Sequence, residues 1–264
     1  MKVPALAALC LGLSATALPA RAQSGEHYLE LSAAYKGGDF GTDTDSRLYA
    51  LLPAWGYIAP RYDLGVTVPV LRLSEDGPGS STTETGLGDV ILRGGHALWD
   101  GSGGARLYGS VALKLPTADD GAGLGTGATD VGAFLSWRTG SVRPLNLYGG
   151  YIVTGEHGSD DLRNVALGGV AVSGRFGRSY GYAGVEARSA AVRGGDAAVE
   201  PQFGLLRPLG RNLLFKGTAF VGLTDGGPDY GVSLGLARWI GNRSAMHAAA
   251  PEPSTVLARA WERP

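Results

Sequence analysis

Regular alternation of apolar and polar residues, in segments of about ten residues, is the feature that most constrains this chain. In the clearest segment, 106–115, the two alternating sets are Leu107, Val111, Leu113 and Leu115 on one side and Tyr108, Ser110, Ala112 and Lys114 on the other. Successive side chains of a β-strand point to opposite faces of a sheet, so this segment has one apolar and one more polar face. Such a strand separates two different environments.

The same alternation recurs along the chain and predicts about twelve strands. They cover roughly residues 27–35, 48–57, 64–70, 89–98, 106–115, 130–137, 145–153, 165–172, 180–188, 199–206, 213–223 and 230–239. About ten residues is the length that a tilted strand needs to cross a bilayer. Pro69 lacks a ladder donor, so its strand is expected to bulge or end nearby.

Connections between these segments alternate between long and short. Long loops are predicted near residues 37–45, 73–87, 117–128, 155–163 and 189–196, and short turns near 59–61, 100–104, 139–144, 174–178 and 207–211. The polar, acidic stretch 73–87 is the longest predicted loop. This asymmetry is typical of outer-membrane barrels. We therefore predict an all-β fold over residues 23–240, an up-and-down antiparallel transmembrane β-barrel of about 12 strands.

Charged residues follow the same division. Acidic residues concentrate in the predicted long loops, and arginines concentrate at the short turns. This segregation favours two membrane faces, although ordinary solvated loops would also contain such charges. The net charge of −1 argues against a nucleic-acid partner, because no basic excess is available to neutralise phosphates.

The two ends of the chain differ from its middle. In residues 1–22, Lys2 precedes a largely apolar run, and an Ala-Arg-Ala cleavage site follows, which predicts a signal peptide and export. The only cysteine, Cys10, lies within it. Beyond residue 22 there is no apolar run of about 18 residues, so membrane entry would require strands. Residues 241–264 are predicted to form a disordered periplasmic tail.

Three short blocks give the chain a resemblance to a known family. They are residues 86–90 (GLGDV), 113–117 (LKLPT) and 123–127 (GLGTG), the last followed by Asp130. With them the chain resembles the outer-membrane channel family named for the meta-pathway of phenol degradation. Ala118 stands where that family usually has glycine, and the second half of the chain contains no family motif. The resemblance implies a barrel that takes up small hydrophobic or aromatic compounds.

A charged cluster is predicted at one end of the barrel. With the N-terminus in the periplasm, Lys114 lies near the external end of its strand, and Asp89 and Asp130 begin the two neighbouring strands there. An unpaired charge facing a narrow interior is costly, so we predict that the three residues pair at the lumen mouth. The cluster would either form a substrate-selective constriction or only hold three strands in register.

Other residues on inward positions are predicted to line the lumen or to plug it. The charged ones are Arg93, Glu186, Arg188, Glu200 and Lys216. The inward aromatic residues, as lumen packing or as a path for an aromatic solute, are Tyr108, Phe134, Tyr148, Tyr180 and Tyr182. An interfacial aromatic girdle is predicted from residues near strand ends, namely Tyr28, Tyr35, Tyr57, Trp99, Trp137, Tyr151, Tyr230 and Trp239.

Catalysis is the competing class of function, because some outer-membrane barrels are lipid hydrolases that use Ser, His and an acid or amide. The four histidines are His27 at a strand start, His96 on the outward set near the periplasmic rim, His157 in a loop and His247 in the tail. Pattern alone brings none of them to a serine and an acid, so no catalytic residue is assigned. We expect no metal, since the acidic loop pairs lack EF-hand spacing, and no cofactor.

Taken together, the patterns predict a channel in a Gram-negative outer membrane. The resemblance implies passive uptake of a small hydrophobic or aromatic solute, and such a barrel would have outer-membrane lipids and lipopolysaccharide as surroundings. About twelve strands lie between filled small barrels and open porins of 16 or more strands, which favours a narrow lumen. The alternative is a structural or interaction barrel with a filled lumen. The sequence indicates no particular oligomeric state.

Overall fold

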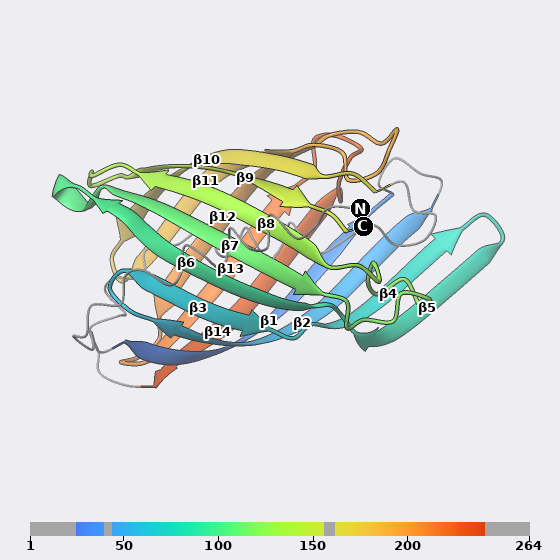
Figure 1. Ribbon diagram of the computed structural model, residues 1–264, viewed down its shortest axis with the longest axis horizontal. Helices are drawn as coiled ribbons and strands as arrows, with labels where there is room; N and C mark the ends of the chain where they lie inside the picture. The colour runs from blue at the N-terminus through green and yellow to red at the C-terminus, as the bar shows by residue number, and fades with distance from the viewer. Residues whose placement is uncertain (1–24, 40–43, 156–161, 241–264) are drawn as a thin grey trace.

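The computed structural model describes residues 25–39, 44–155 and 162–240 (Figure 1). The predicted signal peptide, the predicted tail, His157 and His247 lie outside these ranges. The strands are β1 (Glu26–Gly38), β2 (Asp45–Ile58), β3 (Tyr62–Thr67), β4 (Val70–Gly77), β5 (Ser80–Leu87), β6 (Val90–Asp100), β7 (Arg106–Leu115), β8 (Asp130–Arg138), β9 (Leu145–Val153), β10 (Val165–Phe176), β11 (Ser179–Arg188), β12 (Ala198–Pro208), β13 (Leu213–Val221) and β14 (Tyr230–Ile240), with a short 3-10 helix η1 at Ser102–Gly104. Within the described ranges, no helix is long and apolar enough to span a membrane.

The strands form one antiparallel sheet that closes on itself. Neighbours in sequence are neighbours in the wall from β6 to β14, and β1 pairs with both β14 and β2. β3 and β4 both pair with β2, one after the other, and so count as one strand of the barrel. β5 pairs with β4 and leads directly into β6, so β5 and β6 also count as one strand. The result is a closed barrel of 12 strands, which confirms the predicted fold class. A closed barrel leaves few backbone groups without a partner, as lipid requires.

Pro69 interrupts the wall where the sequence predicted a break. β2 pairs with β3 as far as Ala54 and Thr67, and with β4 from Leu51 and Val70 onward. Between these ladders the Val68 amide donates to the Pro53 carbonyl at 3.0 Å, and the Gly88 amide donates to the Pro69 carbonyl at 2.9 Å. The irregularity also places Gly88 and the following residue at the junction of β5 and β6, where the candidate site lies.

Residues 73–87 were predicted to be a loop, and this prediction is wrong. They fall mostly in an antiparallel hairpin of β4 and β5, which extends beyond the rest of the wall at the right of Figure 1. Gly79 turns it with φ of 88°, a conformation that glycine adopts without strain. Both faces of β5 are exposed along most of its length, so β5 lacks the apolar–polar alternation that identified the other strands. Ser and Thr residues of the hairpin pair across the ladder, as Ser74 and Thr83 do at 3.1 Å.

The wall has an apolar outside and a polar inside. Large apolar side chains are exposed on the outward positions of nearly every strand, for example Leu29, Val111, Leu135, Leu205 and Leu234. The alternate positions are buried and include Ser32, Lys114, Gln202 and Thr218. A water-soluble domain buries its large apolar residues, whereas a barrel in lipid exposes them on its outer face.

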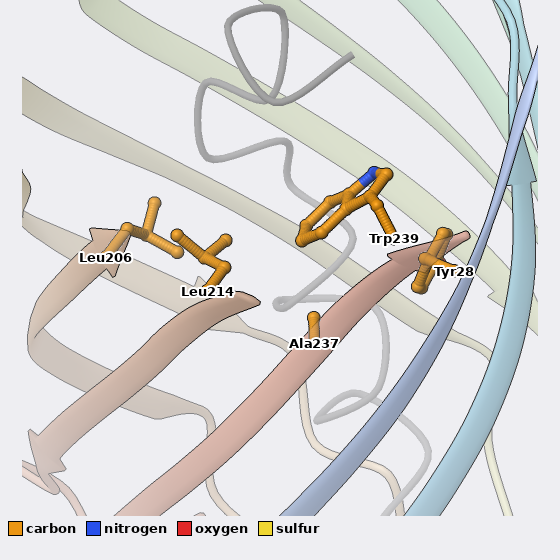
Figure 2. Close-up of a cluster of buried hydrophobic side chains, with 5 residues drawn as sticks. All are labelled: Tyr28, Leu206, Leu214, Ala237 and Trp239. Carbon is orange, nitrogen blue, oxygen red and sulfur yellow. The ribbon is translucent and has the colours of Figure 1, made fainter. Parts of the chain in front are cut away.

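Two aromatic residues of the predicted girdle face the interior instead. Tyr28 and Trp239 are 5% and 7% exposed and form a buried cluster with Leu206, Leu214 and Ala237 (Figure 2). Their position near strand ends suggested a girdle, but each shares its side of the strand with inward residues, Ser32 in β1 and Ala237 in β14. Trp99, Trp137, Tyr151 and Tyr230 are exposed on the outer surface.

A charge placed on the outer face tests the orientation of the wall. Leu234 lies in the middle of β14 and is 52% exposed, and Leu209 lies at a short turn and is 54% exposed. The two side chains have similar exposure but would lie at different depths in a membrane. We expect Leu234→Arg to lower the free energy of unfolding in lipid vesicles by about 2–4 kcal/mol and Leu209→Arg by about 0–1 kcal/mol. Urea titration of both variants measures this difference. Equal, negligible effects would mean that the outer face contacts water.

Candidate functional site

A buried ionic cluster lies at the long-loop end of the barrel and is here called the mouth cluster: Asp89, Lys114, Thr126 and Asp130. Lys114 Nζ lies 3.2 Å from Asp89 Oδ2, 2.8 Å from Asp130 Oδ2 and 2.7 Å from Thr126 Oγ1. The Lys114 side chain is only 3% exposed. The ammonium group therefore has three oxygen partners, the number of its donors. The predicted pairing of Lys114 with both aspartates is confirmed.

Strand register brings these residues together. Lys114 is the direct cross-strand partner of Asp130 between β7 and β8, and of Ile91 between β7 and β6. Asp89 precedes β6 by one residue, at the junction that follows the Pro69 irregularity. The cluster thus joins three adjacent strands at the height where the regular wall ends and the β4–β5 hairpin continues.

Asp89 also fixes the end of β7 through backbone amides. Its Oδ1 accepts hydrogen bonds from Thr117 N and Ala118 N, both at 3.1 Å. The Thr117 hydroxyl donates to the Gly88 carbonyl at 3.0 Å and accepts from the Val90 amide at 2.9 Å. Hydrogen bonds from amides to a carboxylate are charge-assisted and stronger than those between neutral groups. The Lys-Leu-Pro-Thr block and the Gly-Leu-Gly-Asp block therefore hold each other in place.

The β7–β8 loop, residues 116–129, folds back onto this arrangement. The Thr126 hydroxyl donates to the Ala128 carbonyl at 3.2 Å, and the Thr126 amide reaches Asp89 Oδ2 at 3.5 Å. A Cβ on Gly125 would lie 2.8 Å from Asp89 Oδ1 and 2.6 Å from the Ala118 Cβ, so only glycine fits this close approach. Gly125 of the third sequence block is thus explained by its close approach to Asp89 of the first block and to Ala118, which follows the second block.

Leu124 anchors the same loop to the β4–β5 hairpin. Its side chain is buried, and its Cδ1 lies 2.8 Å from where a Cβ on Gly86 would stand. An added Cβ on Gly123 would lie 3.8 Å from Leu73, whose partner across the ladder is the buried Leu48. Burial of Leu48 identifies this as the inner face. The loop therefore lies at the inner side of the wall at the mouth.

The other charged residues that the sequence predicted to face inward also have polar partners. Arg188 and Glu200 are 3.0 Å apart, and Lys216 lies 2.7 Å from Glu30. Arg93 lies 3.9 Å from Asp63 and donates a hydrogen bond to the hydroxyl of Tyr28. All these contacts join residues on buried or half-buried faces of the strands. Whether the residues line a passage stays a prediction.

The inward tyrosines make polar contacts as well. The Tyr148 hydroxyl donates to Glu186 at 2.8 Å and accepts from Gln202 at 3.0 Å, which joins β9, β11 and β12. The hydroxyls of Tyr182 and Thr218 are 3.2 Å apart. These contacts skip intervening strands and so reach across the concave inner surface. Glu30, Asp63, Gln202 and Thr126 were not among the predicted site residues.

An apolar cluster lies on the inner face of β6–β10, and is here called the inner apolar cluster. It consists of Ala112, Ile152, Val165 and Leu167, with Ile91, Phe134, Tyr148 and Ala191 packed against it. Ile91 and Ala112 each neighbour a charged inward residue along their strands, Arg93 and Lys114 respectively. The inner wall thus places a packed apolar cluster, with the partly exposed Ile91, Phe134 and Tyr148 at its edge, directly beside the paired charges.

The described histidines lie on or near the outer surface. His27 is exposed and stacks on Trp55, with ring centroids 5.6 Å apart, and also contacts Tyr57. His96 is exposed, as predicted from its outward position in β6. In the part of the chain that the structure describes, no group of three or more His, Cys, Asp or Glu is arranged to hold a metal ion.

Comparison with known proteins relates the chain to outer-membrane barrels at the level of fold. No family model and no curated sequence matches it. An outer membrane channel from Pseudomonas putida F1 is similar, with a TM-score of 0.66 and 14% identity over 85% of this chain and 100% of that one. The translocator domain of the autotransporter NalP from Neisseria meningitidis is similar with a TM-score of 0.54 and 12% identity, over 88% of this chain and 92% of that one. Identities this low show a shared barrel fold alone.

Removing the mouth-cluster lysine would leave two buried carboxylates without their cation. We expect Lys114→Met to lower the free energy of unfolding by about 3–5 kcal/mol, because breaking a buried pair leaves uncompensated charge. The matched control is Arg106→Met, since Arg106 pairs with Asp100 at 2.7 Å in a much more exposed position, where the cost is about 0–1 kcal/mol. Urea unfolding in vesicles measures both. Similar costs for the two variants would show that the mouth cluster does not hold the strands together.

Proposed function

We propose that this protein is an outer-membrane channel for passive uptake of a small solute of apolar or aromatic character. The observation that supports this most is the inner apolar cluster on β6–β10, which lies beside inward charges that are already paired. The interior of an outer-membrane channel contacts water and is usually polar. The partly exposed Ile91, Phe134 and Tyr148 at the edge of this cluster could contact an apolar solute.

The pairing of the inward charges supports the same solute class. An apolar molecule gains little from ionic groups and is disfavoured by any that must lose water to let it pass. In the mouth cluster the Lys114 ammonium is already bonded to two carboxylates and a hydroxyl. The two carboxylates in turn accept hydrogen bonds from backbone amides; for example, the Gly155 amide donates to Asp130 Oδ1 at 2.9 Å. Fixed partners of this kind favour a rigid mouth over a charged binding site.

The proposed location is the outer membrane, reached through the predicted signal peptide. The exposed apolar outer face and the likeness in fold to an outer membrane channel support it. Lipids and lipopolysaccharide would then contact the outer face, and the β4–β5 hairpin would project into the medium. The short-turn end would face the periplasm, as in barrels of this type.

A barrel with a filled lumen is the second candidate, and two observations favour it. Contacts such as Gln202 to Tyr148 cross the inner surface and occupy part of it. The cluster of Tyr28, Leu206, Leu214 and Trp239 packs inside the barrel at its short-turn end (Figure 2). If these groups close the lumen, the protein would act as a structural or interaction barrel.

Flux measurements on matched variants distinguish these candidates. Phe134 belongs to the inner apolar cluster, whereas Phe203 is 62% exposed on the outer face. In proteoliposomes we expect flux of a probe such as benzyl alcohol to fall several-fold in Phe134→Ser and to stay unchanged in Phe203→Ser, since only the first alters the inner wall. Flux of a small sugar should not fall in either variant.

Two outcomes would contradict the channel role. One is flux and planar-bilayer conductance at the level of protein-free membranes, which a filled lumen would produce. The other is an equal effect of both substitutions on benzyl alcohol flux, which would show that the solute does not contact the inner apolar cluster.

A further inference from the structure

Three exposed arginines without partners lie close together on the outer side of the short-turn rim. Arg207 ends the outward series of β12, Arg211 lies in the turn to β13, and Arg238 lies near the end of β14. Among the described residues, no side chain of the three has a hydrogen-bond or ion-pair partner. An arginine can donate five hydrogen bonds, so these side chains are free to bind a ligand.

Three other arginines of the same rim have side-chain partners. Arg61 donates to the Ala97 carbonyl at 3.2 Å, and Arg138 donates to the Gly104 carbonyl at 3.3 Å. Arg175 donates to the Gly177 carbonyl at 2.8 Å. These guanidinium groups secure the short turns. The three arginines near the β12–β13 turn have no such task in the described structure.

Strand register places the free arginines within reach of one small anion. Arg207 pairs across the ladder with Phe215, whose partner in β14 is Leu236. Arg238 lies two residues beyond Leu236. Arg207 and Arg238 are therefore separated by two strand spacings across the sheet and by two residues along the strand, which places their Cα atoms about 12 Å apart. Two arginine side chains extended toward each other span such a gap, and Arg211 lies in the turn beside them.

The surroundings of these arginines match a lipid. The outer faces and short turns of β10–β14 contain no Asp or Glu among the described residues, so no acid competes for the guanidinium groups. Toward the middle of the membrane, the same surface continues with exposed apolar side chains, including Leu205 and Leu236. A ligand with a phosphate beside two apolar chains would fit both parts of this surface.

We infer that Arg207, Arg211 and Arg238 bind the phosphate of an anionic phospholipid in the periplasmic leaflet, whose acyl chains lie along Leu205 and Leu236. Guanidinium groups bind phosphate through paired, charge-assisted hydrogen bonds. The leaflet follows from the short-turn end, which faces the periplasm in barrels of this type. The inference rests on the proposed membrane location and not on whether the lumen conducts.

Native mass spectrometry of the folded, full-length protein in detergent tests this binding. The probes are phosphatidylglycerol and phosphatidylcholine, which differ in headgroup charge but share acyl chains. We expect the first phosphatidylglycerol to bind more tightly than phosphatidylcholine, and each arginine changed to glutamine to weaken that binding by about fivefold. Inorganic phosphate should not displace the lipid, since it lacks the apolar chains.

The matched control is the triple variant Arg61→Gln, Arg138→Gln and Arg175→Gln, which removes the same charge from the same rim. It should retain most of the phosphatidylglycerol preference, whereas Arg207→Gln, Arg211→Gln and Arg238→Gln together should abolish it. Equal losses in the two triple variants, or no preference in the unaltered protein, would overturn the inference. Probe flux through the same preparation in vesicles reports channel activity separately, so failure of one proposal is distinguishable from failure of the other.

Discussion

Pairing of charges on the inner face is the interaction on which the structure depends most. A barrel wall in lipid must direct its apolar residues outward, so charged residues of the same strands face a narrow interior. Each then needs a partner, because a buried lone charge is costly. Lys114 pairs with Asp89 and Asp130 at the starts of the two neighbouring strands. Arg188 pairs with Glu200, and Lys216 pairs with Glu30.

The mouth cluster also links local sequence to overall shape. The Pro69 irregularity places Asp89 where its carboxylate accepts amides from the end of β7. Thr126 and the close approach of Gly125 bring the β7–β8 loop onto the same carboxylate. One aspartate therefore connects the regular wall, the projecting hairpin and a loop at the mouth. Beside it, the inner apolar cluster provides the surface on which the proposed solute class depends.

The strands were predictable because alternation reports which side of a wall a residue faces, and the mouth cluster was predictable because charged residues begin or end adjacent strands. The β4–β5 hairpin was not, since both faces of β5 are exposed and no alternation marks this strand. The prediction for Tyr28 and Trp239 was wrong because it used only their nearness to a strand end. Their positions in the alternation place them on the same side as the inward residues Ser32 and Ala237. Thr126 was missed because loop contacts have no periodic signal, although the Gly-Thr-Gly block marks the place.

The central claim is that a solute crosses this barrel along its inner face. Blocking that face tests it directly, because the only native cysteine, Cys10, lies in the predicted signal peptide. Ser110 and Val111 are neighbours in β7 that face opposite sides of the wall. Coupling a bulky thiol reagent to Ser110→Cys should stop flux of an aromatic probe into proteoliposomes, while the same reagent on Val111→Cys should not. Undiminished flux with Ser110→Cys fully labelled would contradict the account.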